Sequence, residues 1–284
     1  MVTLTLAHCN GEILEWRWAS NDDIFTTPFW TSCYYIDGIL IDAGAPGGVE
    51  NFEKFILSIG ISNIKACILT HTHEDHAGGA YLLRQKFDIP VYASKQAIKI
   101  LKKGYTYPEY RKIAWGPELH AAEAELFPNP IISNTKGYTF DILPMPGHAP
   151  DQVSFIEKQK EWIFAADGIQ MRYKRIFGDN SNIQEDISLI YQSISELYNF
   201  TRDMDNLVLF LSGKDVIYGT DFIRDSLTAI DNLYQTISTF VLQGLSIEEI
   251  EQKIYTKEDI LSTFTNGELS RRNLIKSFVN WIRK

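Results

Sequence analysis

Three of the six histidines in the chain fall within six residues, in the stretch HTHEDH at 71–76. His71, His73 and Asp75 alternate, so in extended backbone their side chains would point to one side, while His76 must diverge from Asp75. Two neighbouring groups of donor atoms would therefore leave one short loop. Imidazole and carboxylate donors together suit Zn²⁺, Fe or Mn²⁺, so the stretch predicts a metal site.

Two further candidate donors occur later in the chain. His148 lies in PGHAPDQ, directly after a predicted strand, and Asp167 lies in FAADG, at the end of another. Strand ends are the usual position of ligand sites in α/β sheets. The alternative for the histidine-rich stretch, a polar surface loop, explains neither position, so the metal site is the preferred interpretation.

The elements that must position these donors alternate along the chain. Runs rich in β-branched and aromatic residues predict strands at 3–8, 13–20, 32–44, 64–70, 89–94, 138–146, 152–158, 161–169 and 206–212. Asp37-Gly38 is a hairpin turn. Helical spacing predicts helices at 80–87, 95–103 and 186–200. This alternation predicts an α/β fold.

Two regions depart from that alternation. Residues 104–130 contain four prolines and His120 without a regular period. They predict either an insertion that borders the metal site as a lid or a purely structural connection. Residues 221–284 predict C-terminal helices, with Ser246 and Glu249 forming a capping box. Because no linker interrupts the chain, we expect one domain, 1–284.

Composition restricts the possible partners. The net charge of −9 disfavours a nucleic-acid partner, because phosphate contacts need clustered lysine and arginine. No apolar run is long enough to span a membrane, and the N-terminus lacks a basic, apolar leader. Cys9, Cys33 and Cys67 form no CxxC pair and are expected to be reduced thiols. We therefore expect a cytoplasmic protein with a small-molecule substrate.

The motifs together resemble the metallo-β-lactamase-fold superfamily of hydrolases. GILIDAGAPGG at 38–48, HxHxDH at 71–76, a Gly-His turn at His148 and Asp167 at a strand end occur in the order typical of that superfamily. The resemblance extends from about residue 34 to about residue 230. It implies an αββα sandwich with the metal site at one edge, here extended by C-terminal helices.

The resemblance also implies two metal positions. His71, His73 and His148 would hold the first ion, and Asp75 and His76 would hold the second. Zinc is the expected metal, as one or two ions, and iron or manganese is possible in the same donor set.

Three more residues follow from the resemblance. Asp167 would bridge the two ions, and Asp42 would support the ligands structurally. Ala166 stands where the superfamily has a glycine before the bridging aspartate.

Lys214 marks the departure from the superfamily pattern. A histidine normally completes the second ion's ligands from a loop after a late strand, but that position is Lys214 here, and no histidine follows His148. An ammonium group has no lone pair to donate to a metal. Either a second ion binds weakly through Asp75 and its neighbours, or the Lys214 ammonium pairs with Asp75 in place of that ion. In a third reading, Lys214 faces solvent.

The predicted activity is metal-dependent hydrolysis of a small-molecule ester, thioester, lactone or related substrate. A metal-bound water has a pKa of about 7, which yields hydroxide at neutral pH. Asp75 and Asp167 would steer that hydroxide, and Lys214 would stabilise the developing oxyanion. Alternatives are a phosphodiesterase, a mononuclear-iron dioxygenase of the persulfide dioxygenase type using His71, His148 and Asp167, and a degenerate member that only binds or regulates.

Overall fold

The computed structural model describes residues 1–20 and 28–284. The described chain forms two compact units by its internal contacts. The first unit contains Met1–Pro144, Asp151–Ala166 and Val208–Ile217, and the second contains Met145–Pro150, Asp167–Leu207 and Tyr218–Lys284. The single domain expected for 1–284 stays a prediction.

A seven-stranded sheet occupies the N-terminal part of the first unit. Its strands follow the chain order: β1 (Val2–His8), β2 (Ile13–Ala19), β3 (Thr31–Ile36), β4 (Ile39–Ile41), β5 (Ala66–Ile68), β6 (Val91–Ala93) and β7 (Glu125–Leu126). Neighbours are antiparallel up to β4 and parallel from β4 to β7. Asp37 and Gly38 both have positive φ and form the two-residue turn predicted between β3 and β4.

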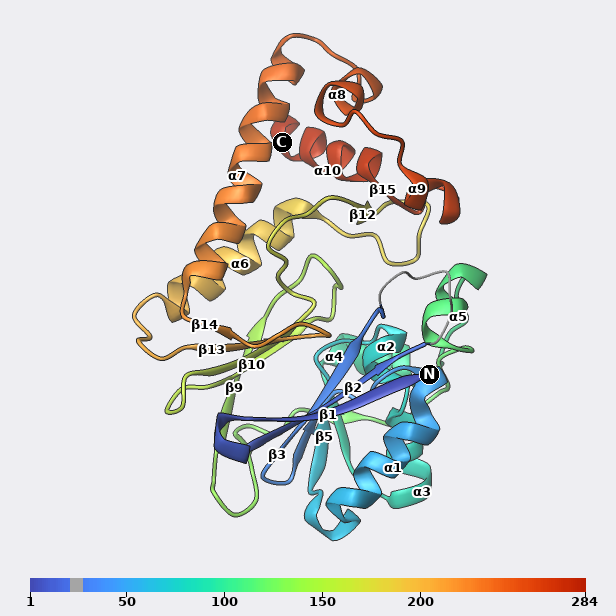
Figure 1. Ribbon diagram of the computed structural model, residues 1–284, viewed down its shortest axis with the longest axis vertical. Helices are drawn as coiled ribbons and strands as arrows, with labels where there is room; N and C mark the ends of the chain where they lie inside the picture. Colours follow the sequence, from blue (N-terminus) through green and yellow to red (C-terminus); the bar gives the residue numbers. More distant parts are fainter. Residues whose placement is uncertain (21–27) are drawn as a thin grey trace. The chain divides into compact units, whose positions relative to one another are not determined.

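A six-stranded sheet completes the strands of the sandwich. Its order is β14 (Ile217–Tyr218), β13 (Val208–Leu211), β11 (Trp162–Ala166), β10 (Val153–Glu157), β9 (Thr139–Pro144) and β8 (Ile131–Ile132). β8 to β11 pair antiparallel, whereas β11 and β13 are parallel. In Figure 1 the strands β9, β10, β13 and β14 lie together, separate from β1, β2, β3 and β5.

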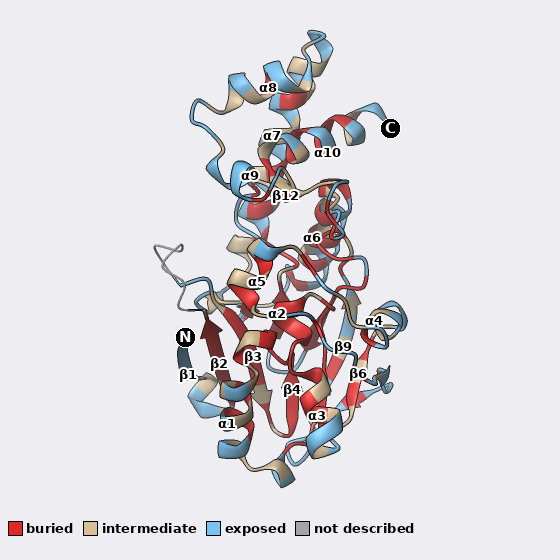
Figure 2. Cartoon of the chain, turned by 90° about the vertical axis from the view of Figure 1, so that its right-hand side faces the viewer, coloured by how far each residue is buried: buried red, intermediate tan, exposed pale blue. Residues whose placement is uncertain are grey.

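The two sheets share an apolar core within the first unit. Tyr34 and Ile41 from the first sheet pack in one cluster with Phe155, Phe164 and Phe210 from the second sheet. The Phe164 and Phe210 rings stack with centroids 4.6 Å apart. Figure 2 shows β2, β3 and β4 in the colour of buried residues, as expected for strands covered on both faces.

Helices cover the other face of the first sheet. They are α1 (Val49–Ile59), α3 (Ala80–Phe87), α4 (Lys95–Leu101) and α5 (Glu109–Trp115). Phe52 of α1 packs against Trp16 of β2, with ring centroids 5.4 Å apart, in a second apolar cluster. Helix α1 was not among the predicted elements. The segment 104–130 contains α5 and β7, and β7 pairs with β6, so part of this segment belongs to the first sheet.

The second unit is mainly helical, as predicted for residues after Asp221. Its elements are α6 (Ile187–Thr201), α7 (Asp221–Leu242), α8 (Ile247–Ile254), α9 (Ile260–Phe264), α10 (Arg271–Arg283), β12 (Ile176–Phe177) and β15 (Leu269–Ser270). α10 packs against α6, α7 and α8. The predicted capping box of Ser246 and Glu249 is confirmed at the start of α8. None of the helices in the described parts of the chain has the length and apolar character that crossing a bilayer requires.

Replacing Phe164 with alanine should lower the free energy of unfolding by about 3–5 kcal/mol, because it removes a buried ring and leaves a cavity beside Phe210. Leu126→Ala is the control, since Leu126 is 59% exposed on β7. It should change the free energy of unfolding by less than about 0.5 kcal/mol. Urea unfolding followed by circular dichroism measures both. Equal effects of the two substitutions would contradict the assignment of this core.

Candidate metal centre

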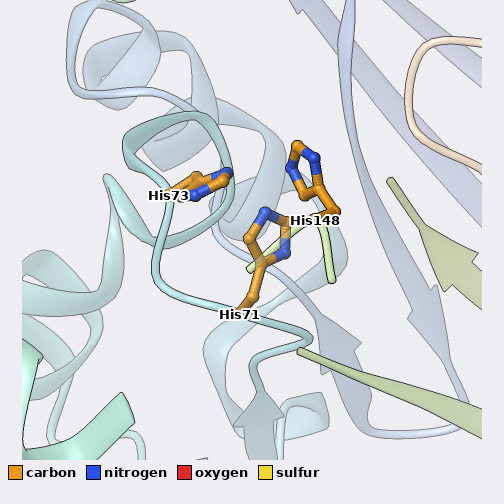
Figure 3. A group of neighbouring side chains, drawn as sticks. All are labelled: His71, His73 and His148. Carbon is orange, nitrogen blue, oxygen red and sulfur yellow. The ribbon is translucent and has the colours of Figure 1, made fainter. Parts of the chain in front are cut away.

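The histidine-rich stretch connects β5 to a single helical turn. His71 and His73 lie in the loop after β5, whereas Asp75 and His76 lie in α2 (Glu74–Ala77). The expectation of extended backbone through Asp75 is therefore wrong, because the extended conformation ends at His73 and α2 begins at the next residue. The His71 ring centroid is 4.5 Å from that of His73 and 4.2 Å from that of His76. Figure 3 shows His71 and His73 on this loop.

Two glycines let this turn pack directly on the preceding loop. An added Cβ at Gly78 would lie 2.4 Å from the Pro46 nitrogen, and one at Gly79 would lie 2.6 Å from the Ala43 oxygen. No side chain fits at such distances. The Gly78-Gly79 pair after the histidines therefore allows α2 and α3 to contact the backbone of the loop after β4.

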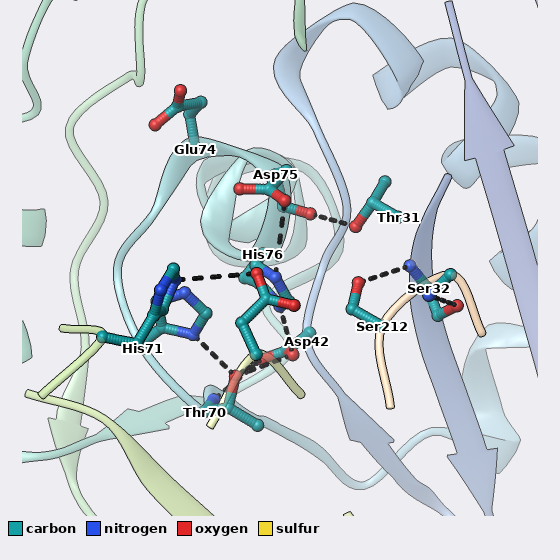
Figure 4. Close-up of polar contacts among 12 residues, drawn as sticks. Thr31, Ser32, Asp42, Thr70, His71, Glu74, Asp75, His76 and Ser212 are labelled. Carbon is teal, nitrogen blue, oxygen red and sulfur yellow. Dashed lines mark hydrogen bonds and ion pairs between the residues drawn. The ribbon is translucent and has the colours of Figure 1, made fainter. Parts of the chain in front are cut away.

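Asp42, at the end of β4, supports the histidines from below (Figure 4). Its carboxylate accepts hydrogen bonds from the Thr70 backbone N–H at 2.7 Å and from the His76 Nδ1 at 2.8 Å. The Thr70 hydroxyl also donates to Asp42 and lies 3.1 Å from the His71 Nδ1. Because Nδ1 of both rings faces these groups, Nε2 is the nitrogen of each imidazole that a metal would bind.

Asp75 lies in α2, and a hydrogen bond from β3 to its backbone also holds it in place. Its carbonyl oxygen accepts a hydrogen bond from the Thr31 hydroxyl at 2.5 Å, which joins α2 to β3. Its Oδ2 lies 3.5 Å from the His76 Nε2. Asp75 is 9% exposed, so the residue is largely buried but retains some access to solvent.

Glu74 makes a buried ion pair that the sequence analysis missed. The Arg111 Nε donates to the Glu74 Oε1 at 2.7 Å, and the Arg111 Nη2 donates to the other oxygen. The Tyr105 hydroxyl donates to the Thr72 carbonyl at 2.9 Å and to Glu74 at 3.1 Å. Burial raises the pKa of Glu74, and Arg111 opposes that effect. Segment 104–130 therefore touches the histidine-rich loop; its role as a lid stays a prediction.

Lys214 lies in the loop after β13, and that loop is fixed by residues of the first sheet. Arg17 donates to the Lys214 carbonyl oxygen at 2.5 Å, and the Gly213 N–H donates to the Ser32 hydroxyl at 2.9 Å. Arg17 is itself paired with Glu15, which is fully buried. The Lys214 side chain is exposed.

The predicted ion pair between the Lys214 ammonium and Asp75 does not form among residues 1–20 and 28–284. The Lys214 side chain is exposed instead, which corresponds to the third of the three readings given for this residue.

The two remaining donors belong to the second unit. His148 lies on Met145–Pro150, which connects β9 to β10, and Asp167 directly follows β11. The His148 Nε2 is 3.6 Å from the Asp167 Oδ2, and the His148 Nδ1 is 2.7 Å from the Glu185 Oε1. Glu185 was not identified from the sequence, since it lies 37 residues from His148 and outside every motif.

The strand that follows the His148 segment begins next to the histidine-rich loop. The Val153 N–H, at the start of β10, donates to the Thr70 carbonyl at 2.9 Å, so this strand begins beside the residue that precedes His71. Ala166, directly before Asp167, has a φ of 45°. This left-handed conformation is easiest for glycine, which explains the glycine expected there.

Comparison with known proteins establishes the fold class. The structure is similar to a metallo-β-lactamase from Pontibacter korlensis, with a TM-score of 0.62 and 16% identity over 81% of this chain and 100% of that chain. It is also similar to the mono-zinc form of the metallo-β-lactamase FIM-1 from Pseudomonas aeruginosa, with a TM-score of 0.58 and 14% identity over 82% and 96% of the two chains. At these identities the similarity concerns the fold. The predicted αββα sandwich with C-terminal helices is confirmed.

The sequence profile of the metallo-β-lactamase superfamily matches residues 26–180, more than half of the chain. The chain belongs to this superfamily, as its motifs predicted.

Similar sequences indicate the type of reaction. Hydroxyacylglutathione hydrolase GloC of Haemophilus influenzae is 31% identical over 148 residues, which cover 50% of this chain and 68% of GloC. A probable metallo-hydrolase of Streptococcus pyogenes, M6_Spy0554, is 30% identical over 182 residues, covering 58% and 71% of the two chains. The probable metallo-hydrolase YybB of Bacillus subtilis is 28% identical over 127 residues, covering 42% and 53%. The chain is a metal-dependent hydrolase.

Replacing Arg111 with alanine should lower the free energy of unfolding by about 3–5 kcal/mol, because it leaves the Glu74 carboxylate buried without its ion-pair partner. Adding Glu74→Gln should recover part of this loss by removing the unpaired charge. Lys112→Ala on the same helix is the control, since Lys112 pairs with Glu109 at the surface. That exposed pair should contribute no more than about 1 kcal/mol. Similar losses for R111A and K112A in chemical unfolding would show that the buried pair does not hold the loop.

Proposed function

We propose that this protein hydrolyses a small-molecule ester or thioester at a metal centre formed by its histidine and aspartate donors. His71, His73 and His148 form one candidate group of donors and would hold one ion. Asp75, His76 and Asp167 would provide a second, weaker position; of these, His76 and Asp167 form a candidate group with His71. The main support is the fixed orientation of three imidazoles, whose Nδ1 atoms face Thr70, Asp42 and Glu185. Metal-binding histidines characteristically have such a partner on the second ring nitrogen.

The donor chemistry is consistent with zinc. Imidazole and carboxylate together suit Zn²⁺, and they also suit Fe and Mn²⁺. The buried thiols are not candidates, because burial raises the pKa of Cys33 and Cys67 well above the usual value and disfavours the thiolate form. We therefore propose zinc as the resident metal, coordinated by nitrogen and oxygen donors.

The residues of the chain would share the work of hydrolysis. When bound, a divalent ion supplies hydroxide at neutral pH by lowering the pKa of water to about 7. The Asp75 carboxylate, held in place by the Thr31 contact to its backbone, would orient the attacking water and accept its proton. The exposed Lys214 ammonium would attract an anionic group of the substrate or stabilise a developing oxyanion.

The similarity to GloC favours a thioester among the possible substrates, since an acylglutathione is a thioester by its chemistry. The acidic net charge of −9 accords with a small-molecule substrate in preference to a nucleic acid. Esters and lactones share the same reacting carbonyl carbon and stay in the proposed class.

The purified protein should contain at least one tightly bound transition metal per chain. His71→Ala and His148→Ala should each reduce the metal content strongly, because each removes a donor, whereas His120→Ala should not. His120 is a suitable control because it is exposed and packs against Tyr81 outside the motifs. Elemental analysis of the four proteins measures this. Absence of metal from carefully prepared wild-type protein would overturn the proposed function.

A panel of substrates tests the proposed hydrolysis, as elemental analysis tests the metal content. Acylglutathione thioesters, lactones, simple esters and phosphodiesters would be assayed for hydrolysis, and a persulfide would be assayed for oxygen uptake. We expect hydrolysis of a thioester or an ester that is lost in H148A and retained in H120A. Oxygen uptake without hydrolysis would support the iron dioxygenase alternative instead.

Lys214→His should raise the metal content toward two ions per chain, because an imidazole supplies the donor that the ammonium lacks. The loop should keep its conformation, since Arg17 binds the backbone carbonyl of residue 214 and not its side chain. Lys214→Ala is the matched control, and it should leave the metal content unchanged. Zinc titration with a competing chelator measures both sites. Two equally tight ions in the unmodified protein would show that Lys214 does not weaken the second position.

A further inference from the structure

Glu185 contacts the Nδ1 of His148. Its Oε1 lies 2.7 Å from that nitrogen, and the side chains of His148 and Glu185 are 10% and 5% exposed. A carboxylate can only accept, so the imidazole donates through Nδ1. This fixes the tautomer in which Nε2 carries the lone pair, which is the nitrogen that a metal would bind.

Glu185 is itself held in place. Its second oxygen accepts from the Phe177 N–H at 2.7 Å, and its own N–H donates to the Phe177 carbonyl at 3.0 Å. Phe177 belongs to β12, which pairs with β15 near the C-terminal end of the chain. The carboxylate therefore cannot turn away from His148 without breaking its contact to this short ribbon.

The start of α6 holds the backbone around His148. The Asp186 N–H donates to the Gly147 carbonyl at 2.9 Å, and the Ser193 hydroxyl donates to the Pro146 carbonyl at 2.7 Å. Gly147 has a φ of 134°, and an added Cβ there would lie 2.5 Å from the Ile190 nitrogen. All these residues belong to the second unit, so this unit fixes both the backbone and the ring of His148.

We propose that Glu185 is a positioning residue that fixes the tautomer and the orientation of His148 for metal binding through Nε2. Through Glu185, the β12–β15 pair and the start of α6 set the affinity for the metal. This inference rests on the proposed function only in taking His148 as a metal ligand. Asp42 makes the equivalent contact to His76 in the first unit, so the two units each supply one carboxylate that orients a histidine.

The alternative is that Glu185 only stabilises the fold of the helical unit. Asp259 provides the comparison, because it is a similarly buried carboxylate in the same unit that contacts no candidate ligand. It accepts from the Arg175 Nε at 2.6 Å and from the Arg271 N–H at 3.0 Å, and its side chain is 9% exposed. Replacing Asp259 should therefore destabilise the unit without acting on His148.

The test compares full-length wild-type, E185A, E185Q and D259A proteins by zinc titration against a competing chelator and by thermal unfolding. We expect E185A to lose about 10- to 100-fold in zinc affinity, the usual effect of removing such a carboxylate. E185Q should lose less, because the amide oxygen can still accept from Nδ1. D259A should retain wild-type zinc affinity even if its thermal stability falls.

A second readout does not depend on metal. Nitrogen-15 spectra of the histidine rings in metal-free protein should show His148 as the Nδ1–H tautomer in wild type and a mixture of tautomers in E185A. Wild-type zinc affinity in E185A would overturn the positioning role while leaving the metal centre intact. Equal loss of affinity in D259A and E185A would assign the effect to fold stability. Failure of the wild type to bind zinc would instead overturn the proposed function.

Discussion

The buried carboxylate of Asp42 is the contact on which the candidate site of the first unit depends. This carboxylate links the end of β4 to the segment after β5, because it accepts hydrogen bonds from Thr70 and His76. These contacts replace the water that the carboxylate and the imidazole lose on burial, which is why both can be almost fully buried. Without Asp42, the Nδ1 of His76 would lose this buried hydrogen-bond partner.

The same loop is held from two other sides. The Gly78-Gly79 pair lets α2 approach the backbone of the loop after β4, and the Glu74–Arg111 pair attaches the loop to α5. A loop with several anchors keeps its donors in one arrangement, so that little reorganisation is needed when a metal binds. The histidine-rich stretch therefore contains both candidate metal ligands and residues, such as Glu74, that anchor the loop to the rest of the first unit.

The second unit contributes more than an extension of the fold. Its helix α6 and its β12–β15 pair fix the segment that carries His148, and Glu185 orients the ring. Each unit thus orients one histidine with a carboxylate of its own. In this protein the second unit takes a direct part in presenting a candidate metal ligand.

The sequence alone was sufficient for most of the longer strands and for the superfamily. Strand patterns such as SCYYIDGILI and ACI are local, and the hairpin turn at Asp37-Gly38 follows from residues that accept positive φ. The donors of HxHxDH are also local, because their spacing alone brings them into one short segment, the loop after β5 and the first turn of α2. Helix α1 and the true conformation of Asp75 were missed, since packing on Trp16 and the start of α2 override the local pattern.

Only the tertiary structure identified the residues that hold the donors. Arg111 lies 37 residues from Glu74, and Glu185 lies 37 residues from His148, so no spacing rule connects either pair. The orientation of Lys214 was likewise undecided until Arg17, 197 residues away, was seen to bind its carbonyl oxygen. A motif records which atoms can bind a metal, because that depends on residue type and short spacing. Which groups orient those atoms depends on contacts between distant segments, and these exist only after the chain has folded.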